Sequence, residues 1–324
     1  KMGVNNSKQK EEINEEIDEH VLNESQNIFC VWSKLRKMSK NKIYISFKRI
    51  YKNGDPDYID RKQCYALKVL EIDDKYTKED FEREKNNLEL LREFSQFIQY
   101  ENPFELQIGS KKYILAPMKY YYQTDFYSYI TQKNFKYDEN LVCLFAYQSL
   151  NISKILKERQ IVHNDIKMHN FLLISRNPFK IILTDFEGSQ FLSKGEKSDI
   201  FGGTPIFESP EVLREELHDF ASDLWSLGVN IYYILFGTFP FKINPNDTRE
   251  KMLEKMENNE LVKLREFISD DAFECMKKIL VFDERITVEN ALKLDWFNSI
   301  EAVDVKETTQ IIKDEEIPDK ITEA

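Results

Sequence analysis

The sequence predicts an α+β protein of two lobes, a small β-rich N-terminal lobe with one helix and a larger, mainly helical C-terminal lobe. Short segments rich in β-branched and aromatic residues dominate residues 28–118. From about residue 124 onward, apolar residues recur at helical spacing instead. The 324 residues, 41% of them hydrophobic, are enough to bury a large core as one domain of two lobes or as two small domains.

Three β segments and one helix are predicted in the N-terminal lobe. The β segments read KIYISFKRI at 42–50, QCYALKVLEI at 63–72 and KKYILAPM at 111–118. The stretch KEDFEREKNNLELLREF at 78–94 is typical of a helix. We therefore expect a sheet interrupted in sequence by a single helix.

Three long helices are predicted in the C-terminal lobe, which we place at residues 119–300. Their apolar residues follow a 3.6-residue period in NLVCLFAYQSLNISKILKER at 140–159, in ASDLWSLGVNIYYILFG at 221–237 and in DDAFECMKKIL at 270–280. The chain contains no internal repeat.

Two acidic flanks enclose these lobes, an N-terminal extension at 1–27 and a C-terminal tail at 301–324. In the N-terminal flank, Ile13, Ile17 and Val21 recur every four residues, which indicates a narrow apolar stripe on an amphipathic helix. The tail has few aromatic residues and excess acid, so alone it has the composition of a disordered segment. We expect a protein partner to order both extensions.

Composition excludes several classes of protein. A net charge of −11 argues against a nucleic-acid-binding protein held by phosphate contacts. The four cysteines lie far apart with no metal-ligand spacing to a histidine, which indicates a reducing compartment and no structural metal. We see no membrane-spanning run and no signal-peptide core. We expect an intracellular protein, either cytoplasmic or cytoskeleton-associated.

One lipidation pattern is present. MGVNNS at 2–7 matches the N-myristoylation pattern, with Gly3 as the acceptor after removal of the preceding methionine. Lys1 precedes Met2, however, so Met2 need not be the initiator. Membrane contact is expected only if Gly3 is myristoylated.

Four motifs stand in a fixed order along the chain. They read YALKVL at 65–70, HNDIKMHN at 163–170, TDFEG at 184–188 and GGTPIFESPEVL at 202–213. Over roughly residues 28–300, this order resembles that of eukaryotic protein kinases of the serine/threonine type. The resemblance implies a bilobal protein-kinase fold in which the helix of the N-terminal lobe is regulatory.

The resemblance implies roles for the polar residues of the catalytic loop. Asp165 matches the catalytic base, Lys167 a cation near the γ-phosphate, and Asn170 a ligand of the second magnesium ion. A lysine two residues after the aspartate is the usual form in serine/threonine kinases. Asp185 matches the other magnesium ligand.

In the N-terminal lobe the resemblance implies an ion pair. Lys68 matches the lysine that holds the α- and β-phosphates of ATP, and Glu84 matches its acidic partner on the next helix. Glu82 on the same helix is the alternative if the register differs.

The family places the adenine base of ATP between apolar residues of the two lobes. Ile43 and Ala66 would lie above the base and Leu172 below it. Met118 matches the residue at the back wall of this pocket. The backbones of Lys119 and Tyr121 match the two contacts to the adenine edge, and Asp125 matches the contact to the ribose.

Contacts around the catalytic loop are implied as well. We expect Thr204 against Asp165 and Lys167, and Glu211 paired with Arg285. We expect Phe186 to stack in a column with Leu88 and His163. Asp223 and Gly228 match the helix that anchors the catalytic loop.

The sequence departs from the family at three places. Arg36, Met38 and Asn41 stand where a G-x-G-x-x-G hairpin would bring bare backbone N–H groups to the phosphates. Glu187 replaces a glycine, so it either restricts the backbone and places negative charge near the triphosphate or joins the metal shell. Asn164 replaces an arginine that grips a phosphorylated loop, so activation by loop phosphorylation is not expected.

Two functions follow from these observations. The first is a serine/threonine protein kinase, of full or low activity, that transfers the γ-phosphoryl group of ATP to protein hydroxyl groups with Mg²⁺ as cofactor. It rests on the retention of six polar positions, namely Lys68, Glu84, Asp165, Lys167, Asn170 and Asp185. The alternative is a pseudokinase that acts as a scaffold in a larger assembly, and it rests on the three departures.

Overall fold

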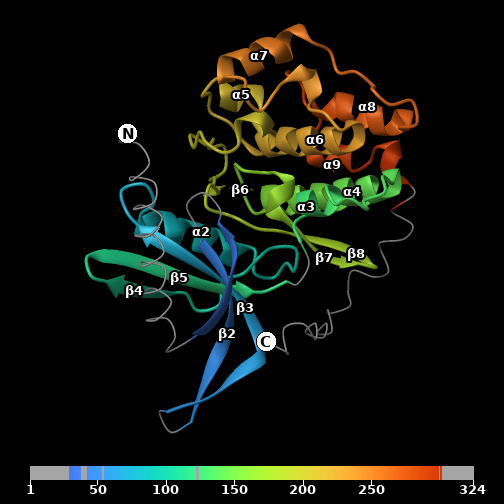
Figure 1. Cartoon of the computed structure of the whole chain (residues 1–324). Helices are drawn as coiled ribbons and strands as arrows, with labels where there is room; N and C mark the ends of the chain where they lie inside the picture. Colours follow the sequence, from blue (N-terminus) through green and yellow to red (C-terminus); the bar gives the residue numbers. More distant parts are fainter. Residues whose placement is uncertain (1–28, 38–41, 53–54, 122–123, 299, 301–324) are drawn as a thin grey trace, which may run out of the picture. The chain divides into compact units, whose positions relative to one another are not determined.

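The computed structural model describes residues 29–37, 42–52, 55–121, 124–298 and 300. These residues form an α+β protein, as predicted, and divide into two compact units (Figure 1). Within the described residues, unit 1 comprises residues up to 81 together with 99–121, and unit 2 comprises 82–98 and residues from 124 onward. Residues 82–98, which the sequence assigns to the first lobe, thus group with unit 2. The predicted boundaries at 27, 118 and 300 stay predictions.

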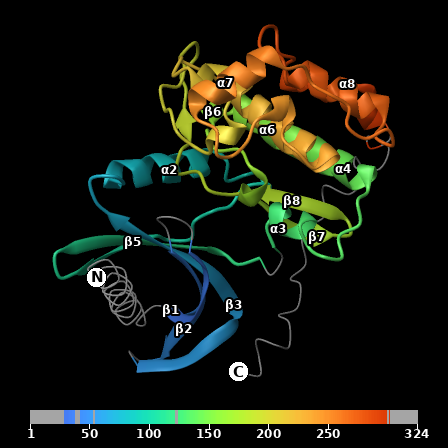
Figure 2. The ribbon, with the colours of Figure 1, turned by 45° about the horizontal axis from the view of Figure 1, so that its top comes forward.

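Unit 1 is built on one antiparallel five-stranded sheet with the order β1-β2-β3-β5-β4 (Figure 2). Its strands are β1 Phe29–Lys37, β2 Lys42–Lys52, β3 Asp55–Ile72, β4 Phe104–Ile108 and β5 Lys111–Lys119. The sequence predicts β2, β5 and the second half of β3. It misses β1 and β4.

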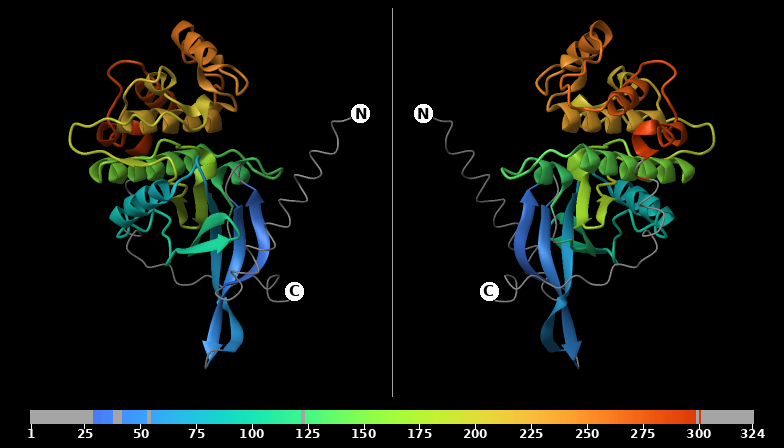
Figure 3. Two further views of the ribbon diagram at one scale, coloured as in Figure 1. Left: turned by 90° about the vertical axis from the view of Figure 1, so that its left-hand side faces the viewer. Right: turned by 90° about the vertical axis from the view of Figure 1, so that its right-hand side faces the viewer.

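Strands β2 and β3 continue as a two-stranded arm beyond the rest of the sheet. Arg49 pairs with Ile59 and Lys52 with Asp55, whereas β1 pairs with β2 only up to Lys48 and β5 pairs with β3 only from Tyr65 onward. Figure 3 shows the two strands, in blue, extending together past their neighbours. The arm explains why β3 begins at Asp55 rather than at residue 63 as predicted.

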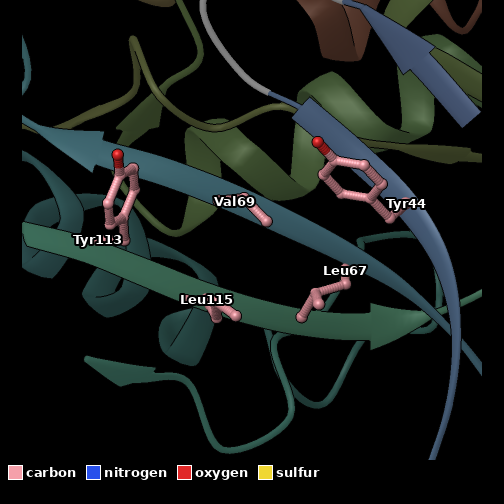
Figure 4. Close-up of a cluster of buried hydrophobic side chains, with 5 residues drawn as sticks. All are labelled: Tyr44, Leu67, Val69, Tyr113 and Leu115. Atoms are coloured by element: carbon pink, nitrogen blue, oxygen red, sulfur yellow. The ribbon is translucent and has the colours of Figure 1, made fainter. Parts of the chain in front are cut away.

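Apolar side chains cover both faces of the sheet. One face carries the cluster of Tyr44, Leu67, Val69, Tyr113 and Leu115 (Figure 4). Successive side chains of a strand point to opposite faces, so the next residue of β3 or β5 belongs to the other face. That face carries a second cluster, made of Leu70, Tyr76, Phe81, Ile114 and Ala116.

Unit 2 is mainly helical. Its longest helices are α4 Glu139–Glu158 and α6 Phe220–Phe236, which pack against each other (Figure 1). With α8 Asp270–Ile279, they confirm the three predicted C-terminal helices. The other α-helices of the described residues are α2 Lys78–Leu90, α3 Phe126–Ile130, α5 Pro210–Leu213, α7 Arg249–Asn258 and α9 Val288–Ala291.

Helix α2 ends at Leu90 instead of at the predicted residue 94. Leu91 N donates to Leu88 O and Arg92 N donates to Glu89 O, so the chain tightens into i→i−3 turns there. Such turns are common at the C-terminus of a helix.

Short strands and 3₁₀ turns complete unit 2. Strand β6 Ile161–Val162 pairs with β9 Gln190–Phe191, and β7 Phe171–Arg176 pairs with β8 Phe179–Leu183. The 3₁₀ turns are η1 Met168–Asn170, η2 Pro205–Phe207, η3 Pro240–Lys242 and η4 Asp295–Phe297. Strands β6 and β7 and turn η1 enclose the loop on which Asp165 lies.

Side-chain caps fix where the three long helices begin. Asp138 accepts from Asn140 N, Asp219 from Ala221 N and Ser269 from Ala272 N. Helix α6 is buried on nearly all sides, and Gly237 ends it in the left-handed conformation, at φ 74°. An almost fully buried helix makes a fixed support for the loops around it.

Several predicted features lie outside the described residues. They are the stripe of Ile13, Ile17 and Val21, the acceptor Gly3, the acidic tail at 301–324, and Met38 and Asn41 of the hairpin. Within the described part of the chain, every helix is too short or too polar to cross a lipid bilayer.

Candidate active site

Three side chains of unit 2 contact one another. Lys167 Nζ lies 2.6 Å from Asp165 Oδ2 and 3.0 Å from Thr204 Oγ1, and Thr204 Oγ1 donates to Asp165 Oδ1 at 3.2 Å. The Asp165 and Lys167 side chains are 20% and 17% exposed, so both stay open to solvent. The predicted contact of Thr204 with Asp165 and Lys167 is confirmed.

Buried polar groups of α6 hold the backbone of this loop. The Asp223 carboxylate accepts from His163 N at 2.7 Å and from Asn164 N at 3.0 Å. Two turns further along the helix, Asn230 Oδ1 accepts from Met168 N at 2.9 Å, and its Nδ2 donates to Ile166 O at 3.2 Å. Four backbone groups that no strand or helix satisfies thereby obtain partners.

The predicted anchoring of the catalytic loop by α6 is confirmed at Asp223, whereas Gly228 lies against the end of α8. Burial raises the pKa of the Asp223 carboxyl, and the charge of His163 and the two N–H donors oppose that rise. A side chain at Gly228 would place its Cβ 2.5 Å from Ile279 Cγ2, so only glycine allows α6 to approach the end of α8 this closely.

Asn170 presents an oxygen suited to a cation. Its Nδ2 donates to Asp165 O at 2.9 Å and to Asp165 Oδ2 at 3.2 Å, which fixes the amide orientation. Its Oδ1 is buried and has no hydrogen-bond partner within the described residues. A buried amide oxygen without a donor is costly unless a ligand satisfies it.

Asp185 lies on the chain segment next to Asn170. Thr184 N and Thr184 Oγ1 both donate to Asn170 O, at 2.8 and 3.0 Å. Among the described residues, no group of three or more His, Cys, Asp or Glu side chains could hold a metal ion alone. Mg²⁺ typically takes one or two protein oxygens plus phosphate oxygens. The side-chain oxygens of Asp185 and Asn170 are of the type that Mg²⁺ prefers, and their role as its ligands stays a prediction.

The backbone around Asp185 shows whether Glu187, in place of a glycine, strains the chain. The left-handed residue is Asp185, at φ 66°, whereas Glu187 is absent from the positive-φ residues. The carboxylate at 187 therefore replaces glycine without forcing a left-handed backbone. Whether Glu187 joins a metal shell stays open.

Phe186 is fully buried and packs edge-on against His163, with ring centroids 4.8 Å apart, as predicted. Phe97 contacts its ring at 6.0 Å. Leu88 is buried as well, and its place in the same column stays a prediction. A hydrogen bond from Asn87 Nδ2 to Ser189 Oγ at 3.0 Å joins α2 to the segment after Phe186.

Asn164 joins three parts of the chain. Its Nδ2 donates to Gly188 O at 2.9 Å and lies 3.4 Å from Ser198 Oγ, while its Oδ1 lies 2.9 Å from His218 Nε2. Ser198 and His218 also exchange two backbone hydrogen bonds. Asn164 has φ 65°, a conformation that asparagine adopts more readily than most residues. Asn164, at the position of the arginine that the resemblance predicts, therefore bonds with Gly188 and His218.

The segment after residue 202 is held at both ends. Gly203 has φ 142°, and a Cβ there would lie 2.8 Å from Asn164 O, so this position requires glycine. Arg285 Nη1 and Nη2 bind the two Glu211 oxygens at 2.8 and 3.2 Å, as predicted. Burial opposes ionisation of Glu211, but the bonds from Arg285 prevail and lower the pKa of its carboxyl.

Unit 1 brings together a second set of candidate residues. Lys68 is 4% exposed on β3, opposite Ile43 of β2 and Ala116 of β5. Ala66 stands opposite Met118, and both are buried. This arrangement places the predicted apolar residues beside the lysine on adjacent strands.

Lys119 and Tyr121, the residues predicted to contact the edge of adenine, lie at the end of β5 and just after it. Lys119 pairs with Tyr65 across the sheet, and its Nζ lies 5.6 Å from the centroid of the Tyr121 ring. Burial raises the pKa of Tyr121, and nearby Glu101 adds to the rise. Their backbone contacts to adenine stay predictions.

Of the two candidate acidic partners of Lys68, the burial of the side chains favours Glu84 over Glu82. Glu84 is 1% exposed, whereas the Glu82 side chain is 43% exposed and pairs with Lys85 at 3.1 Å. A buried carboxylate needs a charged or hydrogen-bonding partner, and an exposed one does not. Lys68 and Glu84 belong to different units, so their ion pair stays a prediction.

Asp125 and Leu172 are neighbours in unit 2 through an isolated β bridge. The Asp125 carboxylate caps α3, where it accepts from Ser128 N at 2.9 Å and from Ser128 Oγ at 2.7 Å. This capping role accounts for its burial. The predicted contact of Asp125 with a ribose stays untested, as does the place of Leu172 beneath the base.

Two residues that the sequence analysis does not single out are central to this site. Asn230 is fully buried in the apolar helix α6, on the same face as Asp223 and seven residues after it. A polar residue at that spacing is a signal that could have identified it. His218 has no such local signal, because its contact with Asn164 joins residues far apart in sequence.

Known proteins share this arrangement of motifs. A family model described as protein kinase domain matches residues 57–297. Myosin light chain kinase 3 of Pongo abelii is 27% identical over 248 residues, which cover 76% of this chain and 30% of that protein.

Two further relatives are 30% identical. Serine/threonine-protein kinase atg1 of Dictyostelium discoideum aligns over 177 residues, 54% of this chain and 26% of that protein. Serine/threonine-protein kinase ULK3 of Homo sapiens aligns over 162 residues, 49% of this chain and 34% of that protein. The chain thus spans about a third or less of the length of these three relatives. Because the family model covers most of the sequence in the order seen in the structure, this chain belongs to the protein kinase family.

Proposed function

We propose that this chain is a serine/threonine protein kinase that transfers the γ-phosphoryl group of ATP to hydroxyl groups of proteins. Kinase domains typically use ATP with Mg²⁺. The observation that carries the proposal is the hydrogen-bonded cluster of Asp165, Lys167, Thr204 and Asn170.

Hydrogen bonds leave Asp165 ready to accept one more. A carboxylate offers roughly four acceptor sites. Lys167 and Asn170 bind Oδ2, and Thr204 binds Oδ1. The remaining site can accept the proton of a substrate hydroxyl, and the three bonds hold the carboxylate in one orientation while it does so. Thr204 contacts both Asp165 and Lys167, so it also fixes the segment beside the substrate.

Fixed charges supply the rest of the proposed mechanism. Lys167 places an ammonium beside Asp165, where negative charge on the transferring phosphoryl group would develop. Asp185 and Asn170 would hold Mg²⁺, which when bound neutralises charge on the phosphate oxygens. Lys68 would bind the α- and β-phosphates from unit 1. Such catalysis depends mainly on positioning and electrostatics.

The second candidate function is a pseudokinase that serves as a scaffold. It is favoured by one observation, the β1–β2 hairpin. The pairs Arg36–Ile43 and Lys37–Lys42 close this hairpin where the family has glycines, and it contains no glycine. Bare backbone N–H groups form the phosphate cradle of such hairpins, and the sequence has no glycine here to expose them. A protein partner of the two acidic extensions is part of this second proposal.

The test is transfer of labelled γ-phosphate from Mg·ATP to the chain itself and to generic protein substrates. Asp165→Asn is compared with wild type and with Asp199→Asn, a matched change at an exposed position of unit 2. Loss of a general base lowers rates by about 10²–10⁴, so we expect loss in the first variant only. Equal transfer by Asp165→Asn would remove its assignment as the base. No transfer by wild type at high ATP would favour the scaffold.

A further inference from the structure

Lys68 makes a contact within unit 1 that the family pattern does not predict. Its Nζ lies 3.2 Å from the Tyr100 hydroxyl oxygen and 5.9 Å from the centroid of the same ring. Lysine can only donate, so the phenolic oxygen accepts this hydrogen bond. Lys68 is 4% exposed, so the bond forms where water competes little.

The position of Tyr100 follows from the pairing of β3 with β5 and from one isolated bridge. Tyr100 forms an isolated bridge with Met118, and Lys68 stands opposite Ala116 on the other side of the same strand, β5. Ala116 and Met118 are two residues apart and therefore point to the same face. The Tyr100 side chain lies over this face to reach Lys68, and the small side chain of Ala116 leaves room for it.

Apolar packing keeps the Tyr100 ring in place. The ring stacks on Phe81, with centroids 5.8 Å apart and planes inclined by 28°. It packs against the buried cluster that contains Leu70, Tyr76 and Ala116. Tyr100 thus joins a rigid apolar core to the ammonium group of Lys68.

We infer that Tyr100 is a positioning residue for Lys68, whose hydroxyl holds the ammonium group where it meets the phosphates of ATP. This inference deepens the proposed function, because it concerns the lysine assigned to phosphate binding. The hydrogen bond from Lys68 to Tyr100 lies within unit 1 and acts in addition to the predicted ion pair of Lys68 with Glu84. It supplies part of the positioning of the phosphates that a hairpin without glycines cannot supply.

The first test measures Lys68 directly and needs no nucleotide. A limiting amount of an amine-acylating ester is applied at neutral pH, and modification of Lys68 is read by peptide mass spectrometry relative to the exposed Lys112. Tyr100→Phe removes the hydroxyl but keeps the ring. Tyr76→Phe removes a hydroxyl from the same cluster and serves as the matched control.

We expect Lys68 to react about tenfold faster in Tyr100→Phe than in wild type, because its amine no longer has to break a hydrogen bond to the phenolic oxygen before it reacts. Tyr76→Phe should match wild type. Equal rates in Tyr100→Phe and wild type would overturn the inference. So would the same acceleration in Tyr76→Phe, since that would indicate general loosening of the cluster.

The second test separates this inference from the proposed function. Equilibrium binding of Mg·ATP is measured for wild type, Tyr100→Phe, Lys68→Met and the double variant. If Tyr100 acts through Lys68, Tyr100→Phe weakens binding several-fold in wild type and has no further effect in Lys68→Met. An equal effect in both backgrounds contradicts action through the lysine. If wild type binds no ATP while Lys68 still responds to Tyr100→Phe, the proposed function fails and the positioning contact stands.

Discussion

The two units hold their candidate residues by different physical means. In unit 1, Lys68 stands on a strand whose backbone is already paired on both sides, and the buried side chains of Leu67 and Val69 fix that strand in the sheet. In unit 2, Asp165 lies on a loop whose backbone groups lack such pairing. There the buried side chains of Asp223 and Asn230 supply the missing partners.

This comparison predicts which unit is sensitive to a cavity in the core and which to the loss of a buried hydrogen-bond acceptor. A strand that is already hydrogen-bonded depends on apolar packing, so it should be sensitive to cavities. A loop that depends on buried polar side chains should be sensitive to the loss of an acceptor. The following substitutions test this difference between the units.

The largest effect is expected for Asp223→Ala. The change leaves His163 N and Asn164 N buried without an acceptor, and each such group costs about 1–3 kcal/mol, so we expect a loss of about 2–6 kcal/mol. Urea unfolding measures it, and hydrogen exchange should show lost protection in the loop at 163–170. Asp219→Ala removes only the cap of the same helix and should cost about 1 kcal/mol. Similar losses in both variants would contradict the role of Asp223 as the loop's anchor.

The next effect is expected for Leu115→Ala in unit 1. Leu115 is fully buried in the cluster of Figure 4, and large-to-small changes at such sites cost about 2–5 kcal/mol. Hydrogen exchange should increase in β3 and β5 and leave α6 unchanged. Leu90→Ala, at a side chain that is 46% exposed, is the control and should change little. If exchange rises equally in α6, the two units do not respond separately.

A smaller effect is expected at Asn164. Asn164→Ala removes its hydrogen bonds and places a Cβ without polar atoms at φ 65°, which costs about 1–2 kcal/mol in strain alone. Asn164→Gly removes the same bonds without that strain. We expect both to increase exchange at Ser198 and His218, with Ala the less stable of the two. Unchanged exchange in both would show that Asn164 does not hold this segment.

The smallest effect is expected for the contribution of Asp247 to stability at low pH. A hydrogen bond from Lys255 lowers the pKa of Asp247 from 3.8 to about 2. A carboxyl with a lowered folded-state pKa stabilises the protein above its unfolded value, and that contribution disappears as the pH falls from about 4 to about 2. Asp247→Asn should therefore unfold at a lower temperature than wild type at pH 6, and at the same temperature near pH 2. Asp271→Asn, an exposed position on α8, is the control. A difference that persists at pH 2 would contradict this account.

The sequence by itself determined the elements and residues that depend on local spacing. Helices α4, α6 and α8 follow from the apolar period of their own segments, and Asp165, Lys167 and Asn170 stand close together in one loop. The pairing of Glu211 with Arg285 was also foreseen, because both belong to motifs of fixed order. Strands β1 and β4 were not, since neither has a clear alternation of its own.

Only the tertiary structure decided which distant residues support these motifs. The contacts of Tyr100 with Lys68, of His218 with Asn164 and of Asn230 with Met168 join residues 32, 54 and 62 positions apart. A hydrogen bond of this kind depends on a distance of about 3 Å that the packing of whole strands and helices sets. Local propensity and spacing carry no information about that distance, so the residue types alone could not reveal these partners.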